Sequence, residues 1–227
     1  MELPIPDRTT AGKALARRLF AQYRHRPDML VLALPRGGLP VAFEVAETLD
    51  TDLDVMIVRK LGAPMQPELA MGAIAADGIR VLNDDVVTSL RISDEQIESV
   101  VARESRELER RTLAYRGNRP WPDLEGRTII LVDDGVATGA TMFAAIDAVR
   151  ALHAAKVVVA IPVAPADTVS RLEGSADKVV CLATPEPFFS IGQWYQRFEQ
   201  ISDDEVVELL ERRWQEIRDT IDKRGGK

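Results

Sequence analysis

Five short apolar runs restrict the fold of this chain more than any other feature of its sequence. They lie at residues 29–34, 53–58, 128–132, 157–161 and 179–183. Runs that are apolar without alternation are typical of strands buried on both faces of a parallel sheet. Helical spacing of apolar residues occupies the stretches between them, most clearly at 39–49 and from 139 to about 152. This alternation predicts a doubly wound α/β fold with a mainly parallel five-stranded sheet.

The composition fits a globular protein and excludes several other classes. The 227 residues are 46% hydrophobic, enough to bury a core, and the net charge of −7 argues against non-specific nucleic-acid binding. Cys181 is the only cysteine, so we expect neither a disulfide nor a cysteine metal site. The N-terminus lacks the apolar segment of a secretory signal, and the longest apolar stretch is too short to span a membrane. We therefore expect a cytoplasmic protein that does not associate with membranes.

The region between the second and third runs is expected to be irregular at first and helical later. Residues 59–72 contain two glycines and two prolines, which predicts a long loop of the kind that often forms a functional lid. Two short strands are expected around Asp77 and Gly78, a pair suited to a hairpin turn. Ser93 and Gln96 form a predicted capping box at the start of a long helix.

Charged and small residues follow the predicted strands at their carboxyl ends. These segments are PRGG at 35–38, RK at 59–60, DDGVATGAT at 133–141, PVAP at 162–165 and TPEPFF at 184–189. In open α/β sheets, ligands bind in the crevice beyond these ends. The sequence thus predicts a binding site at one edge of the sheet.

The segment 133–141 has the composition of a site for a phosphorylated sugar. Its small residues allow the backbone N–H groups of residues 136–141 to converge at a helix N-terminus, where they could hold a dianionic phosphate. Asp133 and Asp134 can accept hydrogen bonds from the vicinal hydroxyls of a sugar, or hold Mg²⁺ directly or through water. Thr138 and Thr141 add hydroxyl donors. An ordinary turn followed by a helix N-cap uses the same residue types and is the alternative.

Two other phosphate motifs are excluded. A P-loop requires a lysine directly after the glycine that opens the helix, and Ala140 stands there. A phosphoacceptor receiver domain has its paired carboxylates after the first strand, whereas Asp133 follows the third long apolar run.

The segment VDDGVATGAT resembles the phosphoribosyl pyrophosphate (PRPP) motif of type I phosphoribosyltransferases, in the version found in adenine phosphoribosyltransferases. LPRGG resembles the pyrophosphate loop of this family, and VRKLGAP resembles the stretch that leads into its flexible catalytic loop. The resemblance covers roughly residues 29–185. It implies a single phosphoribosyltransferase domain over 1–227, with a core at about 28–185 and a small hood formed by 1–27 and 186–227.

The resemblance also implies roles for individual residues. Asp133, Asp134, Arg36 and Lys60 would be catalytic, and Mg²⁺ would bind at the two carboxylates. The peptide bond before Arg36 would be cis. The residues implied to bind PRPP are Arg36, Gly37, Gly38, Arg59, Lys60, Asp133, Asp134, Gly135, Val136, Ala137, Thr138, Gly139, Ala140 and Thr141. Without the resemblance, the cations among them could equally be ordinary surface charges.

The implied reaction is phosphoribosyl transfer from PRPP to a nitrogenous base, with release of pyrophosphate. A purine-like base is favoured, and Ala137 stands where the hypoxanthine-guanine branch has a carboxylate facing the purine. Phe188, Phe189 and Trp194 follow the last strand and could stack on the base, although core or lid packing is the alternative. Two further alternatives stay open: a regulatory protein that senses PRPP without transferring its ribosyl group, and a homodimer in place of a monomer.

Overall fold

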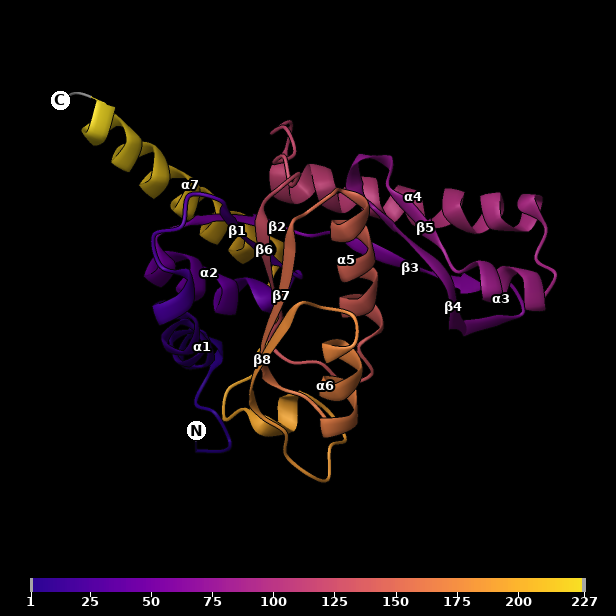
Figure 1. Cartoon of the computed structure of the whole chain (residues 1–227), viewed down its shortest axis with the longest axis horizontal. Coiled ribbons are helices and arrows are strands. Elements are labelled where there is room, and N and C mark those ends of the chain that lie inside the picture. Colours follow the sequence, from indigo (N-terminus) through magenta and orange to yellow (C-terminus); the bar gives the residue numbers. More distant parts are fainter. Residues whose placement is uncertain (1, 226–227) are drawn as a thin grey trace.

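The computed structural model describes residues 2–225 (Figure 1). The strands are β1 (Met29–Ala33), β2 (Asp52–Val55), β3 (Val58–Ala63), β4 (Gln66–Ala75), β5 (Arg80–Leu82), β6 (Thr128–Val132), β7 (Lys156–Val163) and β8 (Lys178–Ala183). The helices are α1 (Arg8–Tyr23), α2 (Gly38–Leu49), α3 (Asp84–Ser89), α4 (Asp94–Arg116), α5 (Ala140–Ala151), α6 (Ala166–Glu173) and α7 (Asp203–Gly225), with short 3₁₀ turns η1 (Ala76–Gly78) and η2 (Gly192–Trp194). The outermost ends of the predicted domain, residue 1 and residues 226–227, lie outside this range.

The main sheet confirms the predicted fold class. Its order is β2-β1-β6-β7-β8, and every neighbouring pair is parallel. Val31 and Ile130 face α1 and α2, whereas Leu32 and Leu131 face α5. Helices therefore cover both faces of the sheet (Figure 1), which explains why its central strands are apolar at every position.

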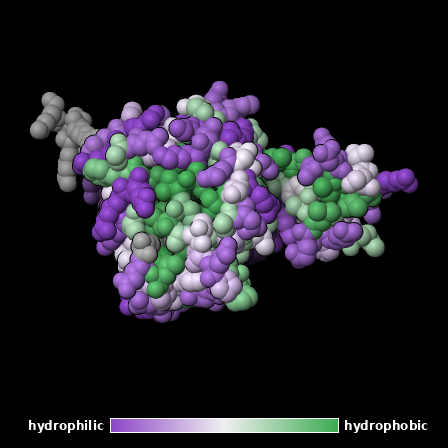
Figure 2. Space-filling model, turned by 60° about the horizontal axis from the view of Figure 1, so that its bottom comes forward, coloured by the Kyte–Doolittle hydropathy of each residue, from purple (hydrophilic) through white to green (hydrophobic). Residues whose placement is uncertain are grey.

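An arm that contains the strands β3, β4 and β5 extends from this body (Figure 1). Its structure corrects the prediction for residues 59–72. The expected loop is an antiparallel hairpin of β3 and β4, joined by β5 into a second sheet. The register of the hairpin shifts on both sides of Gly62, where a Cβ atom would lie only 2.3 Å from the carbonyl oxygen of Pro67. Glycine and proline thus mark a bulge inside paired strands here, instead of interrupting the strands. Figure 2 shows the arm as a separate lobe with hydrophobic and hydrophilic residues side by side.

The hairpin also changes the position of two predicted site residues. The strand expected at 53–58 ends at Val55, and a new strand of the second sheet begins at Val58. Arg59 and Lys60 consequently lie on the arm instead of at the end of a strand of the main sheet. The turn expected at Asp77 and Gly78 is present between β4 and β5 as η1, with Gly78 at a φ of 75°.

The segments before α1 and after β8 are joined to each other. Ile5 donates its N–H to the carbonyl oxygen of Trp194 at 2.7 Å and accepts the N–H of Gln196 at 2.8 Å. The Ile5 side chain is fully buried and packs in a cluster with Tyr195 and Val163. We call the residues from Leu3 to Asp7 the N-terminal strap and residues 184–202 the C-terminal hood. In the part of the chain that the structure describes, no helix is long and apolar enough to cross a membrane.

Candidate active site

Two predicted segments touch at the carboxyl edge of the main sheet. β1 and β6 are adjacent, with Ala33 paired to Val132, so the PRGG loop and the two aspartates emerge side by side. A Cβ atom on Gly37 would lie 2.0 Å from Oδ2 of Asp134, and one on Gly38 would lie 2.9 Å from the Cα of Asp133. Glycine is therefore required at these positions because the backbone of one segment lies against the carboxylates of the other.

The two carboxylates have different surroundings. Oδ1 of Asp133 accepts the backbone N–H of Asp134 at 2.8 Å, and Asp133 stays partly exposed. Asp134 is only 7% exposed, and its Oδ2 accepts a hydrogen bond from Nε of Arg8 at 2.8 Å. Burial and the neighbouring charge of Asp134 raise the pKa of Asp133 well above its ordinary value. Burial also raises the pKa of Asp134, although the Arg8 guanidinium opposes that effect.

The segment predicted to hold a phosphate, which we call the cradle, leads into the start of α5. Gly139 has a φ of 85° and turns the chain into the helix. The N–H groups in the first turn of α5 have no acceptor within the helix, and its dipole places partial positive charge there. The hydroxyl of Thr168 on α6 donates to the carbonyl oxygen of Ala137 at 2.8 Å and so fixes the turn. This geometry suits an anion.

Val136 is an exception to that prediction. Its side chain is buried, and its N–H donates to the carbonyl oxygen of Val163 at 3.0 Å. In this structure the N–H of Val136 is therefore not free for an anion, because it is bonded to β7.

A cleft of about 650 Å³ separates the arm from α5 and contains part of the cradle. Thr138 and Ala140 lie on one wall, and Lys60 on β3 lies on the other. Nζ of Lys60 is 3.4 Å from the carboxylate of Glu68 across the hairpin. The arm thus brings a cation to the side of the cradle, and the predicted contact of Lys60 with the leaving group stays a prediction.

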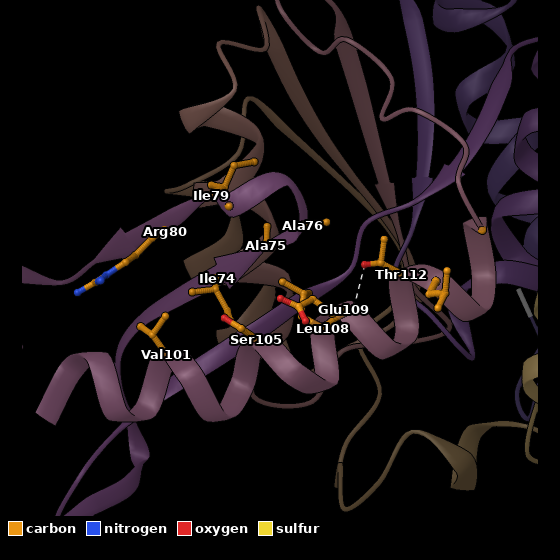
Figure 3. A pocket seen from close by; sticks show the side chains of 13 residues that line it. Ile74, Ala75, Ala76, Ile79, Arg80, Val101, Ser105, Leu108, Glu109 and Thr112 are labelled. Carbon is orange, nitrogen blue, oxygen red and sulfur yellow. Dashed lines mark hydrogen bonds between the residues drawn. The ribbon is translucent and has the colours of Figure 1, made fainter. Parts of the chain in front are cut away.

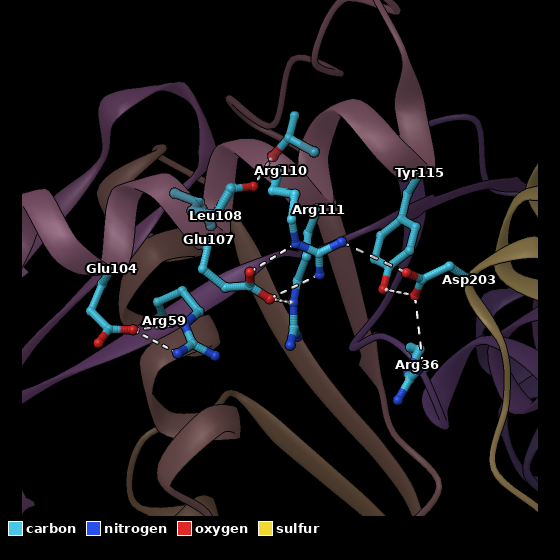
Figure 4. Close-up of polar contacts among 10 residues, drawn as sticks. Arg36, Arg59, Glu104, Glu107, Leu108, Arg110, Arg111, Tyr115 and Asp203 are labelled. Carbon is cyan, nitrogen blue, oxygen red and sulfur yellow. Dashed lines mark hydrogen bonds and ion pairs between the residues drawn. The ribbon is translucent and has the colours of Figure 1, made fainter.

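The two predicted arginines are held by acidic residues near α4 (Figure 4). Arg36 lies 3.7 Å from the carboxylate of Asp203, which also accepts the hydroxyl of Tyr115 at 2.7 Å. Arg59 makes an ion pair of 2.6 Å with Glu104. The peptide bond between Pro35 and Arg36 is cis, as predicted. Each arginine is therefore ion-paired with a carboxylate of the protein, Arg36 with Asp203 and Arg59 with Glu104.

Another hollow of about 470 Å³ lies between α4 and the strands β4 and β5 (Figure 3). Its lining is mainly apolar and includes Ile74, Ile79, Val101 and Leu108. None of the predicted site residues lines it. The presence of a hollow therefore does not by itself identify the site, and the chemistry at the sheet edge carries the assignment.

Comparisons with known proteins identify the family of the chain. The family model of the phosphoribosyl transferase domain matches residues 3–193. The chain belongs to this family. A Mycobacterium tuberculosis protein named "putative phosphoribosyl transferase" is 53% identical over 206 residues, which is 91% of this chain and 46% of that protein. The chain therefore spans about half the length of the curated relatives it matches.

A solved structure supports the fold of this phosphoribosyl transferase domain along nearly its whole length. The crystal structure of the Thermus thermophilus protein TT1426 is 42% identical, with a TM-score of 0.83. The match covers 91% of this chain and 97% of that one. About nine-tenths of this chain therefore shares its fold with that relative.

Some aromatic side chains of the C-terminal hood are packed against the protein, and one is exposed. Phe188 and Trp194 lie with ring centroids 6.2 Å apart, and both pack on the cluster around Ile5. Phe189 is 83% exposed. Tyr195 is buried, and its hydroxyl donates to the carbonyl oxygen of Asp134 at 2.6 Å. Stacking of a base on Phe188, Phe189 or Trp194 stays a prediction.

The residues present fit a Mg²⁺ ion only if water and a phosphorylated ligand supply most of its coordinating oxygen atoms. Within residues 2–225, no group of three or more histidine, cysteine or acidic side chains is arranged to hold a metal ion. Mg²⁺ typically binds through one or two carboxylates, with water and substrate phosphates completing its shell. Asp133 is partly open and fits that role, whereas the carboxylate of Asp134 is engaged by Arg8.

Arg8 is the site residue that sequence reasoning missed. It precedes Asp134 by 126 residues, and in the sequence it is one of several arginines around the first helix. No motif marks it, because its role depends on how the strap is placed over the sheet edge.

Proposed function

We propose that this domain transfers a phosphoribosyl group from PRPP to a nitrogenous base and releases pyrophosphate, with Mg²⁺ required. The observation that carries the proposal is the contact of Gly37 with Asp134 and of Gly38 with Asp133. It joins the pyrophosphate loop to the ribose end of the PRPP motif at one edge of the sheet.

The proposed reaction exchanges one bond at the anomeric carbon. The bond from this carbon to a pyrophosphate oxygen breaks, a bond to the acceptor nitrogen forms, and the proton on that nitrogen passes to solvent. Positive charge develops on the sugar and negative charge on the leaving group, as in other glycosyl transfers. Position and electric field therefore supply most of the catalysis.

Each part of the site has a task in this scheme. The amides at the start of α5 hold the 5′-phosphate, and Asp133 accepts hydrogen bonds from the ribose hydroxyls. Arg36, Arg59 and Lys60 stabilise the departing pyrophosphate once they leave their present carboxylate partners. Bound Mg²⁺ would neutralise charge on the phosphate oxygens.

A purine-like acceptor is part of the proposal. Ala137 supplies no carboxylate to face a 6-oxopurine, and its carbonyl oxygen is occupied by Thr168. An acceptor that needs no general base at this position is therefore favoured, as in the adenine version of the motif.

One observation favours a second candidate, a regulatory protein that senses PRPP without transferring its ribosyl group. The three cations proposed for the leaving group are all ion-paired within the protein, Arg36 with Asp203, Arg59 with Glu104 and Lys60 with Glu68. A sensor needs the phosphate cradle, but it has less need of free cations at the leaving group.

Pyrophosphate release separates the two candidates. The protein is incubated with PRPP, Mg²⁺ and a panel of purines, pyrimidines and other nitrogenous acceptors, and release is followed continuously. Transfer predicts release that depends on one acceptor class and is absent in Asp133→Asn/Asp134→Asn. Binding of PRPP without acceptor-dependent release across the panel would favour the sensor.

A further inference from the structure

Arg8 occupies a buried position beside the candidate site. It is 8% exposed, with Nε donating to Asp134 at 2.8 Å and Nη1 donating to the carbonyl oxygen of Glu199 at 2.8 Å. Its guanidinium also lies 3.9 Å from the centroid of the Phe198 ring. A buried arginine is costly unless its charge and its donors are satisfied, and these partners come from the sheet edge and the hood.

The surrounding backbone holds this arginine in place. Asp7 caps α1 by accepting the N–H of Thr10 at 2.8 Å, and its other oxygen is ion-paired with Arg197 of the hood. The strap and hood are further paired through Ile5. The position of Arg8 is therefore fixed on both sides, by its own helix and by the hood.

Asp134 is held at both its side chain and its backbone. Arg8 binds the carboxylate, and the hydroxyl of Tyr195 binds the carbonyl oxygen. Gly37 closes the remaining side, since a Cβ atom there would meet the same carboxylate oxygen at 2.0 Å. This carboxylate has little room for a sugar hydroxyl.

Asp133 is more open than Asp134, although a Cβ atom on Gly38 would lie 3.1 Å from its Oδ1. It is partly exposed, its Oδ1 accepts the backbone N–H of Asp134, and among the described residues no arginine or lysine forms an ion pair with it. The two adjacent aspartates of the motif therefore have different environments in this structure.

We propose that Arg8 is a positioning residue that holds the carboxylate of Asp134 beside the hood, so that Asp133 is the carboxylate presented to the ribose of a phosphoribosyl ligand. Arg8 also cancels one of two adjacent negative charges, which lowers the repulsion that a polyanionic ligand meets. This inference rests on the proposed binding of PRPP but not on transfer.

Calorimetric titration with PRPP and Mg²⁺, without acceptor, tests the assignment. We expect Asp133→Asn to weaken binding by about tenfold or more, the loss of a charge-assisted hydrogen bond to ligand. Asp134→Asn keeps an oxygen that accepts from Arg8, so we expect a clearly smaller loss of affinity than in Asp133→Asn. An Asp134→Asn effect as large as that of Asp133→Asn would overturn the assignment.

Variants of Arg8 test the positioning itself. Arg8→Met leaves Asp134 charged and unpaired, and we expect PRPP binding to fall by about tenfold. Arg8→Lys should recover part of this loss, and Arg8→Met/Asp134→Asn should recover more, because no buried charge stays unpaired. Unchanged binding in Arg8→Met would contradict the proposal.

A matched control and a ligand-free measurement complete the test. Arg116 and Asp54 form another buried pair, with hydrogen bonds of 2.8 and 2.9 Å. Arg116→Met should lower the melting temperature without weakening PRPP binding. A double-mutant cycle on thermal unfolding should couple Arg8 to Asp134 but not to Asp133. If the wild type binds no PRPP, the proposed function fails, and absence of that coupling separately refutes the positioning role.

Discussion

At the residue scale, Gly37 is the most sensitive position of the site. Its φ of −62° and ψ of −30° suit any residue, so alanine there tests the contact with Asp134 and not backbone strain. The added methyl would have to displace the carboxylate oxygen 2.0 Å away. We expect Gly37→Ala to destabilise the protein by about 1–3 kcal/mol, as overpacking does, and to abolish PRPP binding. Urea unfolding and calorimetry measure the two effects.

Gly174 provides the control for that substitution. It also has a helical backbone, with a φ of −76°, and the nearest atom to a Cβ there is 3.4 Å away. We expect Gly174→Ala to preserve PRPP binding and to leave stability unchanged or slightly higher. Similar losses in both variants would show that the contact at Gly37 is not specific to the site.

Tyr115 offers a prediction that depends on pH. Burial and the hydrogen bond to Asp203 raise its pKa to about 12. The folded state therefore favours the neutral phenol, and this stabilisation is complete below the unfolded pKa of about 10 and is lost as the pH rises to about 12. The phenolate absorbance of wild type minus Tyr115→Phe should have its midpoint near the higher value. A midpoint near the lower one would mean that Asp203 does not hold this hydroxyl.

At the element scale, the sequence predicted the buried parallel strands well and the arm poorly. Strands β1 and β6 are apolar because both faces are covered, and this condition is visible in one segment alone. The hairpin depends on cross-strand pairing between Val58 and Ala75 and on a bulge at Gly62, which no local pattern indicates. The pairing of Arg8 with Asp134 lies still further beyond local sequence, because it needs the complete fold.

The arm is expected to contribute to ligand binding through Lys60. Its ammonium lies in the cleft that also contains Thr138 and Ala140. Removing one charge-assisted contact costs about 1.5–3 kcal/mol, so Lys60→Met should weaken PRPP binding by about tenfold or more. Lys13→Met on α1 is the control, since Lys13 is exposed and pairs with Glu44 at 3.9 Å. Equal affinities of Lys60→Met and the control would remove Lys60 from the site.

At the scale of the whole molecule, the strap and the hood pack together at the edge of the main sheet. The strap and the hood are far apart in sequence, yet Ile5 pairs with residues on both sides of Tyr195. Tyr195 and Arg8 in turn contact Asp134. A substitution that loosens the strap should therefore also loosen the hood and shift the carboxylate of Asp134.

Ile5→Ala tests this coupling. The side chain is fully buried, and its truncation should cost about 2–5 kcal/mol of stability. Because the strap would loosen, amide exchange of Gln196, which donates to the carbonyl oxygen of Ile5, should accelerate more than exchange in β6. Ile97→Ala on α4 removes an equally large side chain that is 2% exposed, but it lies in the core cluster away from the strap. Ile97→Ala should lower the melting temperature without accelerating the amide exchange of Gln196 relative to exchange in β6. Faster relative exchange of Gln196 in both variants would indicate a general loss of stability instead of coupling between strap and hood.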